Sequence, residues 1–134
     1  MTTPFVDTNV VVYSLDAADP RKQAVAREVL ASRPRPRISP QVLRETYSVA
    51  VAKLDVDRSV AAEMIGSMLP HVAIVEDAAL VEAAVRCVDR WQISIWDALI
   101  VEGARRAGCD LLLSEDLQDG MDFDGVVVQN PFAA

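Results

Sequence analysis

The sequence predicts an α/β fold built around a parallel sheet. Short apolar runs that are typical of strands alternate with longer segments of helical periodicity, and this alternation favours parallel strands joined by helices. Two runs, 111–113 and 126–128, are unbroken triplets of leucine and of valine, a composition typical of strands that helices cover on both faces. A chain of 134 residues is long enough for one domain, which we expect to span 1–134.

Local signals place the elements along the chain. The expected strands are 4–6, 37–39, 71–75, 111–113 and 126–128, and the expected helices between them are 8–15, 20–30, 40–54, 57–69, 77–91 and 95–107. Thr8 is the expected N-cap of the first helix. Asp19 and Ser39 are each followed by proline, which is common at the first position of a helix. Ser94 is expected to cap the last helix, and Gly108 to end it.

The distribution of charge is uneven. A net charge of −7 argues against a polyanionic partner, because like charges repel. Residues 21–58, however, contain nine Lys and Arg against four Asp and Glu. Within this segment, Arg33, Arg35 and Arg37 alternate with prolines and would share one face of an extended loop. Contact with nucleic-acid phosphates and a merely solvated loop are both open interpretations of these three side chains.

Composition and single residues exclude several classes of protein. The N-terminus lacks the basic start and long apolar segment of a secretory signal, and no apolar stretch reaches the ~18 residues of a membrane helix. We therefore expect a cytoplasmic protein without a membrane partner. His71 is the only histidine, which excludes RNA cleavage by a histidine pair. Cys87 and Cys109 are expected to be small buried side chains, and Trp91 and Trp96 are expected in the core.

Four acidic residues are expected near the edge of the sheet where parallel strands end, which is where ligands bind in open α/β sheets. Asp7 ends the run 4–6, and Asp116 follows the run 111–113. Asp97 lies in the first turn of the last helix, and Glu45 lies in the helix that begins after Ser39. If these carboxylates converge, each close pair repels by about 3 kcal/mol at an effective dielectric constant of about 20.

Such repulsion requires a compensating proton or cation. Clustered carboxylate oxygens suit Mg²⁺ or Mn²⁺, which keep several waters and also bind phosphate oxygens. A site of this composition can activate water for displacement at phosphorus.

Each acid also has a purely structural interpretation. Asp97 fits the last position of a capping box over residues 94–97. Asp7 fits ordinary turn chemistry, a lone Glu45 on a helix is usually solvated, and Asp116 lies in a polar acidic loop. Only their joint placement favours a functional site.

Four segments resemble, in order and spacing, the acidic motifs of PIN-domain ribonucleases: 5–9, 38–45, 95–100 and 112–116. The resemblance covers nearly the whole chain. Together with residues 126–132, it is most similar to VapC-type toxins of bacterial toxin–antitoxin systems. It implies a single PIN-like domain with a five-stranded parallel sheet and helices on both faces, and an endoribonuclease that requires Mg²⁺ or Mn²⁺. The partners it implies are an RNA substrate, a cognate antitoxin protein and a second copy in a homodimer.

The resemblance also implies roles for individual residues. The implied metal ligands and catalytic residues are Asp7, Glu45, Asp97 and Asp116. Asn9 and Ser114 are implied as supporting hydrogen-bonding residues. Some family members have a further acid after the last motif, but here residues 116–120 depart from the commonest pattern, so a role for Asp119 stays open.

Three alternatives remain open. A haloacid-dehalogenase-like phosphohydrolase also begins with an acid after its first strand, but it requires a second Asp where this chain has Asn9. It further requires a late lysine, and Lys22 and Lys53 are the only lysines. A general RNA-processing PIN nuclease and an inactive PIN-like binding module share the motifs, although the presence of all four acids favours an active enzyme.

Overall fold

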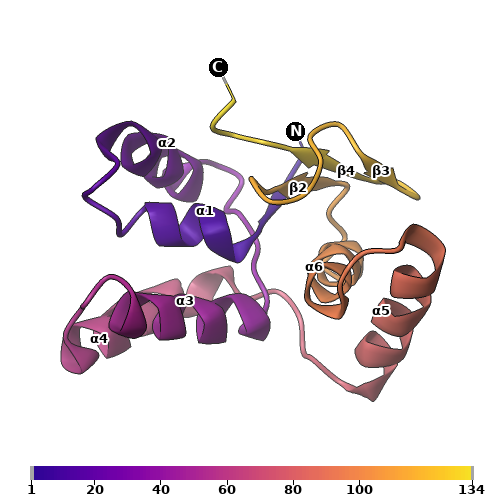
Figure 1. The fold of residues 1–134 in the computed structure, drawn as a ribbon, viewed down its shortest axis with the longest axis horizontal. Coiled ribbons are helices and arrows are strands. Elements are labelled where there is room, and N and C mark those ends of the chain that lie inside the picture. Colours follow the sequence, from indigo (N-terminus) through magenta and orange to yellow (C-terminus); the bar gives the residue numbers. More distant parts are fainter. Residues whose placement is uncertain (1, 134) are drawn as a thin grey trace.

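The computed structural model describes residues 2–133, so that the ends of the expected domain, Met1 and Ala134, lie outside the described residues. A four-stranded sheet is flanked by helices (Figure 1). The elements in chain order are β1 (Pro4–Val6), α1 (Thr8–Tyr13), α2 (Pro20–Ala31), α3 (Pro40–Ala52), α4 (Arg58–Met68), the 3₁₀ turn η1 (Leu69–His71), α5 (Ala78–Trp91), α6 (Ile95–Arg106), β2 (Leu111–Leu113), β3 (Asp122–Phe123) and β4 (Val126–Gln129).

The sheet has the order β1-β2-β4-β3 and is mostly parallel. In its centre, Phe5 of β1 is in register with Leu112 of β2, which is in register with Val128 of β4. The expected α/β fold class is therefore confirmed. The expected strand number is not, because the described residues form four strands and β3 runs antiparallel to β4.

Two segments predicted as strands, 37–39 and 71–75, make only isolated bridges. Arg37 pairs with Phe5, and Ile38 pairs with Val72, both in the parallel direction. Neither segment can extend further, because Ser39 already caps α3 and His71 belongs to the turn η1. The segment 37–39 thus lies beside β1 and the segment 71–75 lies beside 37–39, but both pairings are too short to form strands.

The β3–β4 hairpin was not predicted. Asp124 and Gly125 connect its strands, with φ of 51° and 99°, the combination that a tight two-residue hairpin requires. One face of β4 is open, since Val126 and Val128 are buried while Val127 and Gln129 are exposed. The expectation that helices cover both faces of the run 126–128 is therefore wrong.

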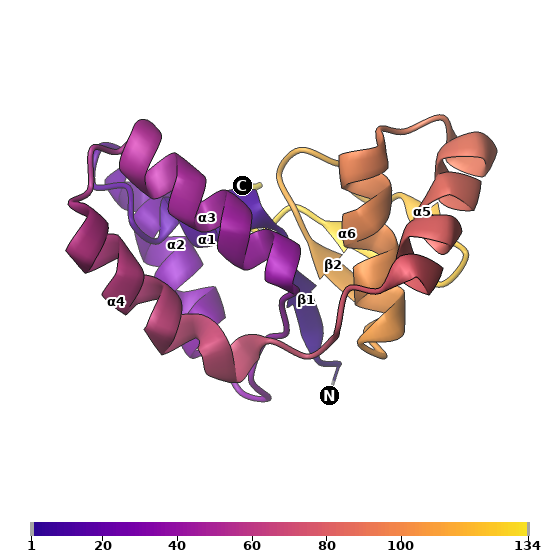
Figure 2. The same ribbon diagram turned by 90° about the horizontal axis from the view of Figure 1, so that it is seen from below.

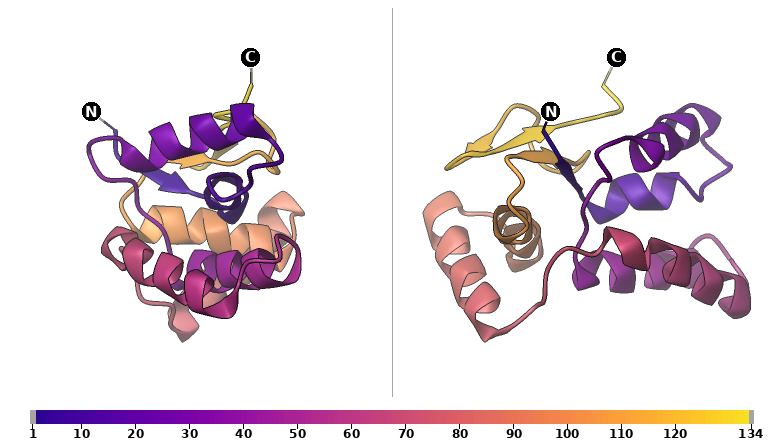
Figure 3. Two further views of the ribbon diagram at one scale, coloured as in Figure 1. Left: turned by 90° about the vertical axis from the view of Figure 1, so that its left-hand side faces the viewer. Right: turned by 180° about the vertical axis from the view of Figure 1, so that it is seen from behind.

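Helices lie on both faces of the sheet. Figure 3 shows α2 on one side of the strands and α6 on the other. α6 packs closely on β1 at Gly103, where an added Cβ would contact the ring of Phe5 at 3.4 Å. Seen from below, α1 to α4 form one group and α5 with α6 a second, with β1 and β2 between them (Figure 2). The carboxyl ends of β1 and β2 therefore lie between the two groups of helices.

Helix caps follow the sequence signals, with one exception. The side chains of Asp19, Ser39 and Ser94 accept hydrogen bonds from backbone N–H groups of the following turn. The first helix is capped by Asp7, not by Thr8, because the strand ends at Val6 and the Asp7 carboxylate reaches the first N–H of the helix. That helix also ends earlier than expected, at Tyr13.

The expected core is correct for the thiols and wrong for one tryptophan. Cys87 and Cys109 are both buried. Trp91 is half-buried and packs edge to face on Phe123. Trp96, in contrast, is 64% exposed, because it lies in the first turn of α6 beside a cavity rather than over the sheet. Within residues 2–133, none of the helices combines the length and apolar character that a membrane crossing requires.

Candidate functional site

The four acids predicted from the sequence line one cavity. Asp7 follows β1, Glu45 lies on α3, Asp97 lies in the first turn of α6, and Asp116 follows β2. All four line a cavity of about 460 Å³. Residues that are distant in sequence meet here because β1 and β2 are adjacent and parallel, so that their carboxyl ends share one edge.

Asp7 is the buried member of the cluster, with 6% of its surface exposed. Its Oδ1 accepts the Thr8 N–H at 2.7 Å, and its Oδ2 accepts the Ser114 hydroxyl at 2.8 Å. Burial raises the pKa of Asp7 to about 6; the charges of Asp116 and Asp97 also raise it, while the bonds from Ser114 and Thr8 oppose the shift. Asp7 therefore holds its negative charge at a free-energy cost that a cation would offset.

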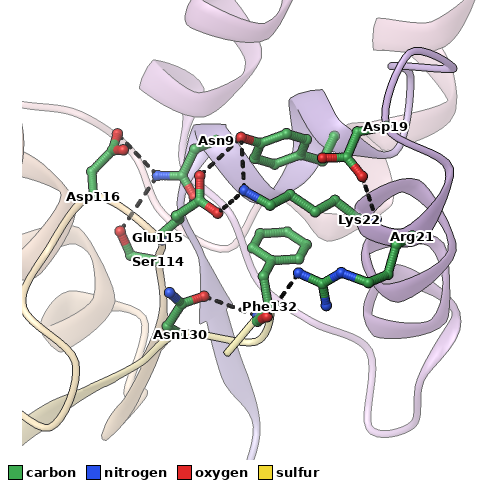
Figure 4. A network of polar contacts seen from close by, with 10 residues as sticks. Asn9, Asp19, Arg21, Lys22, Ser114, Glu115, Asp116, Asn130 and Phe132 are labelled. Atoms are coloured by element: carbon green, nitrogen blue, oxygen red, sulfur yellow. Dashed lines mark hydrogen bonds and ion pairs between the residues drawn. The ribbon is translucent and has the colours of Figure 1, made fainter. Parts of the chain in front are cut away.

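Asn9 lies between the carboxylates of Asp7 and Asp116, and Figure 4 shows its contacts with Asp116 and Ser114. Its Nδ2 donates to Oδ2 of Asp7 and to Oδ2 of Asp116, both at 3.2 Å. Its Oδ1 accepts the backbone N–H of Glu115 at 3.0 Å, which fixes the direction of the amide. The positive end of the Asn9 amide therefore faces both negative charges. Together with Ser114, which is fully buried, Asn9 joins the ends of β1 and β2.

Glu45 is held by two residues that sequence analysis missed. Thr8 Oγ1 donates to Glu45 Oε1 at 2.7 Å, and Gln41 Nε2 lies 3.4 Å from the same oxygen. Gln41 is one helical turn before Glu45, a spacing that could have suggested the contact. The bond from Thr8 joins α1 to α3 and could not be inferred from spacing.

Asp97 lies in the capped first turn of α6 and also lines the cavity. Its backbone N–H donates to Ser94 Oγ at 3.0 Å, which is the N-cap half of the expected capping box. Its side chain lines the cavity, where burial raises the pKa of Asp97 and the charges of Asp116 and Glu45 raise it further. The Ser94 side chain, which lowers this pKa, only partly opposes the rise, so Asp97 carries its charge at a cost that a cation would offset.

Glu115 is a further acid at the cavity, and its charge is already balanced. Its carboxylate contacts Lys22 Nζ and accepts the Tyr13 hydroxyl at 2.9 Å (Figure 4). The Lys22 ammonium also lies 4.6 Å from the centroid of the Tyr13 ring. Burial alone would raise the pKa of Glu115, but the bonds from Lys22 and Tyr13 outweigh it and lower that pKa. The cluster anchors the turn that carries Ser114 and Asp116.

Comparison with known proteins identifies the family. The model of the PIN domain family matches residues 5–119 of the chain. The chain belongs to the PIN domain family. The match includes Asp7, Glu45, Asp97 and Asp116, so the resemblance inferred from the sequence is confirmed at the level of the family. This assignment also removes the haloacid-dehalogenase-like phosphohydrolase from the alternatives.

Solved structures share the fold of this PIN domain. VapC20 of Mycobacterium tuberculosis, described as a sarcin-ricin loop cleaving toxin, has a TM-score of 0.66 at 24% identity over 85% of this chain and 92% of that chain. A toxin–antitoxin complex from Klebsiella pneumoniae has a TM-score of 0.65 at 18% identity, covering 96% and 98%. VapBC-1 of nontypeable Haemophilus influenzae has a TM-score of 0.68 at 14% identity, covering 98% and 99%. No curated protein matches the sequence.

Some expected residues lie outside the acidic cavity of the PIN domain. Asp119 does not line it; its Oδ1 instead accepts the backbone N–H of Asn130 at 2.9 Å. Arg37 pairs with β1 at Pro4 and Phe5, so the loop 33–37 lies at the amino ends of the strands, opposite the acids. Arg37 donates to the carbonyl of Ala107, which gives its guanidinium a structural role. The structure thus does not bring Arg33, Arg35 and Arg37 to the acids.

The donor set of the cavity fits a hard divalent cation. All four acids offer oxygen ligands. Ionised Asp7 costs the folded state free energy, and the positive end of the Asn9 amide already faces Asp7 and Asp116. Among residues 2–133, no three Asp, Glu, His or Cys side chains are arranged as a complete metal site in this conformation. The carboxylates would therefore have to turn toward a shared ion.

Proposed function

We propose that this PIN domain is an endoribonuclease that requires Mg²⁺ or Mn²⁺ and acts as the toxin of a toxin–antitoxin pair. The convergence of Asp7, Glu45, Asp97 and Asp116 in one cavity carries the proposal. Membership of the PIN family supports RNA as the substrate, and so does the fold shared with a toxin that cleaves the sarcin-ricin loop.

The residues that would hold the metal are Asp7, Glu45, Asp97 and Asp116. When bound, Mg²⁺ or Mn²⁺ activates water and compensates the charge that develops on the phosphate during hydrolysis. The cavity lining contains six carboxylates, of which Glu115 is paired with Lys22, and its single cation is that of Lys53. A phosphate approaching these residues is repelled unless their charge is compensated, so the proposal requires the cation for binding as well as for hydrolysis.

The chain supplies orientation to this site. Ser114 and the Thr8 N–H fix the two oxygens of Asp7, while the Thr8 hydroxyl holds Glu45. Asn9 links Asp7 to Asp116 across the ends of two strands. Thr8 and Asn9 lie in the first turn of α1, and Ser114 directly follows β2, so the acids are oriented by residues attached to the ends of packed elements.

Two partners belong to the proposal. Similar folds occur in a toxin–antitoxin complex and in VapBC-1, which supports a cognate antitoxin protein as a partner of this chain. A homodimer is the further expectation from the family, and sedimentation of the purified protein tests it directly. A mass of one chain at micromolar concentration would contradict the dimer without affecting the nuclease.

Cleavage of RNA by the purified protein tests the activity. We expect degradation of total RNA in the presence of Mg²⁺ or Mn²⁺ and none after addition of a chelator, with activity restored by excess metal. Degradation that persists in the chelator contradicts the metal requirement. Absence of cleavage with every divalent metal tried favours the inactive binding module.

Growth of a bacterial host distinguishes a toxin from a general RNA-processing enzyme. Induced expression of the wild-type chain is expected to arrest growth, and co-expression of the neighbouring small gene is expected to restore it. The variant Asp116→Asn is the matched control and should permit growth. An enzyme that cleaves RNA in vitro but leaves growth unchanged would favour a role in RNA processing.

A further inference from the structure

Trp96 presents a large aromatic ring at the acidic cavity. It is the second residue of α6, directly precedes Asp97 and lines the same cavity. Trp96 is 64% exposed, whereas the other tryptophan, Trp91, packs edge to face on Phe123 with 5.3 Å between ring centroids. Among residues 2–133, the aromatic pairs are Trp91 with Phe123 and Tyr13 with Phe132, so the Trp96 ring is in neither.

The backbone that carries this ring is fixed. Gln41 is 3% exposed, and its Nε2 donates to the backbone carbonyl of Trp96 at 3.2 Å. The cap formed by Ser94 and the N–H of Asp97 closes the same turn. The ring therefore projects from a rigid helix start, and holding it against a planar ligand costs little conformational entropy.

We propose that Trp96 stacks on a base of the RNA substrate and thereby selects RNA that is unpaired beside the cleaved bond. This inference deepens the proposed ribonuclease function and rests on it. A base inside a duplex has both faces covered by its neighbours, so that only an unstacked base can offer a face to the indole. Because Trp96 and Asp97 are consecutive, a base on the ring belongs to a nucleotide at or next to the phosphate near the carboxylates.

The charge of the cavity explains why stacking is needed here. Five lining carboxylates remain besides Glu115, which Lys22 balances, and Lys53 is the single cation in the lining, so phosphate contacts contribute little affinity at this point. The basic loop 33–37 lies at the opposite edge of the sheet and cannot substitute. Stacking on an aromatic ring does not depend on charge, so it can hold RNA beside acids that repel its backbone.

Binding of matched RNAs to variants at this position tests the proposal. Each variant carries Asp116→Asn so that the RNA is not consumed, and the probes are an unpaired RNA of roughly 12 nucleotides and the same strand annealed to its complement. Trp96→Ala should weaken binding of the unpaired RNA by roughly 5- to 100-fold and leave binding of the duplex unchanged. Trp96→Phe should retain most of the affinity.

Salt dependence and fluorescence separate stacking from a structural role of the ring. The factor lost in Trp96→Ala should be the same at low and high salt, because no phosphate contact is removed. In the Trp91→Phe variant, unpaired RNA should quench the fluorescence of the remaining Trp96. In the Trp96→Phe variant, unpaired RNA should leave the fluorescence of the remaining Trp91 unchanged.

Two results would overturn the assignment. Selection by stacking is contradicted if Trp96→Ala binds unpaired RNA as tightly as its parent does. It is also contradicted if Trp96→Ala loses the same factor in affinity for unpaired RNA and for the duplex. Loss of binding to a protein partner with unchanged RNA affinity would make Trp96 a protein-docking residue instead. If the parent chain binds unpaired RNA through Trp96 but wild type cleaves none, the proposed nuclease function fails while the stacking role stands.

Discussion

Replacing Asp7 by asparagine is expected to stabilise the metal-free protein. Burial raises the pKa of Asp7 from its usual 3.8 to about 6, so the ionised carboxylate costs the folded state roughly 3 kcal/mol at neutral pH. Asn is neutral and removes this cost. In Asn, Nδ2 takes the place of Oδ2, so the bond from Asn9 Nδ2 is lost at a cost of about 1 kcal/mol, whereas Ser114 Oγ can accept from the new N–H instead of donating. The net gain in unfolding free energy is therefore about 2 kcal/mol, or roughly 8 °C in Tm.

The pH dependence of this gain has a defined sign. The folded-state pKa of Asp7 lies above the unfolded one, so the wild-type protein loses stability as pH rises from about 4 to about 6. Asp7→Asn does not titrate, and its advantage should therefore grow over this interval and level off above it. Below pH of about 4 the carboxyl is protonated in both states and the advantage should vanish or reverse.

Thermal melts in chelator over this pH range provide the assay. Asp119→Asn is the matched control, because Asp119 lies in the loop after Asp116 but outside the cavity, and its backbone contact can be kept by an amide oxygen. The control should change Tm little at any pH. A difference between Asp7→Asn and wild type that is negative and constant across the pH range would refute the burial cost assigned to Asp7.

Three further predictions concern the metal, the ion pair and the turns. Mn²⁺ at about 100 times its Kd should stabilise the wild-type protein by about 2.7 kcal/mol. Asp97→Asn keeps the backbone cap but should gain much less stability from Mn²⁺, and equal shifts in Tm would contradict metal binding by Asp97. Lys22→Met should lower the unfolding free energy in denaturant titrations, and adding Glu115→Gln should recover most of the loss, since the loss comes from the unpaired carboxylate. Gly108→Ala should lower the unfolding free energy by about 1 kcal/mol because φ there is +74°. Gly66→Ala in α4, where a Cβ meets nothing within 4 Å, should raise it by up to about 1 kcal/mol, and a change of the same sign in both variants would contradict this reasoning.

The features that sequence analysis predicted depend on local chemistry. Asp19 and Ser39 begin helices because a side-chain oxygen and a following proline fix the first turn within a few residues. The meeting of Asp7 with Asp116 followed from one further rule, that parallel strands end at the same edge of a sheet. The β3–β4 hairpin also had a local signal in Asp124-Gly125, which was overlooked because β3 is only two residues long.

The features that could not be predicted depend on tertiary contacts. The bond from Thr8 to Glu45 and the pairing of Lys22 with Glu115 join residues that are 37 and 93 positions apart, and no spacing rule links them. Trp96 was expected in the core because large aromatic side chains are usually buried. Its place at a cavity follows only from how α6 begins beyond the edge of the sheet, which hydropathy does not encode.

The most direct test compares two acids of one loop in RNA cleavage. Asp116 lines the cavity with Asp7, Glu45 and Asp97, whereas Asp119, three residues later, does not. In the presence of Mg²⁺, Asp116→Asn should lower kcat/KM by about 100-fold or more, and Asp119→Asn should stay within about twofold of wild type. Equal activity of the two variants, whether both retained or both lost, would contradict the assignment of the cavity as the active site.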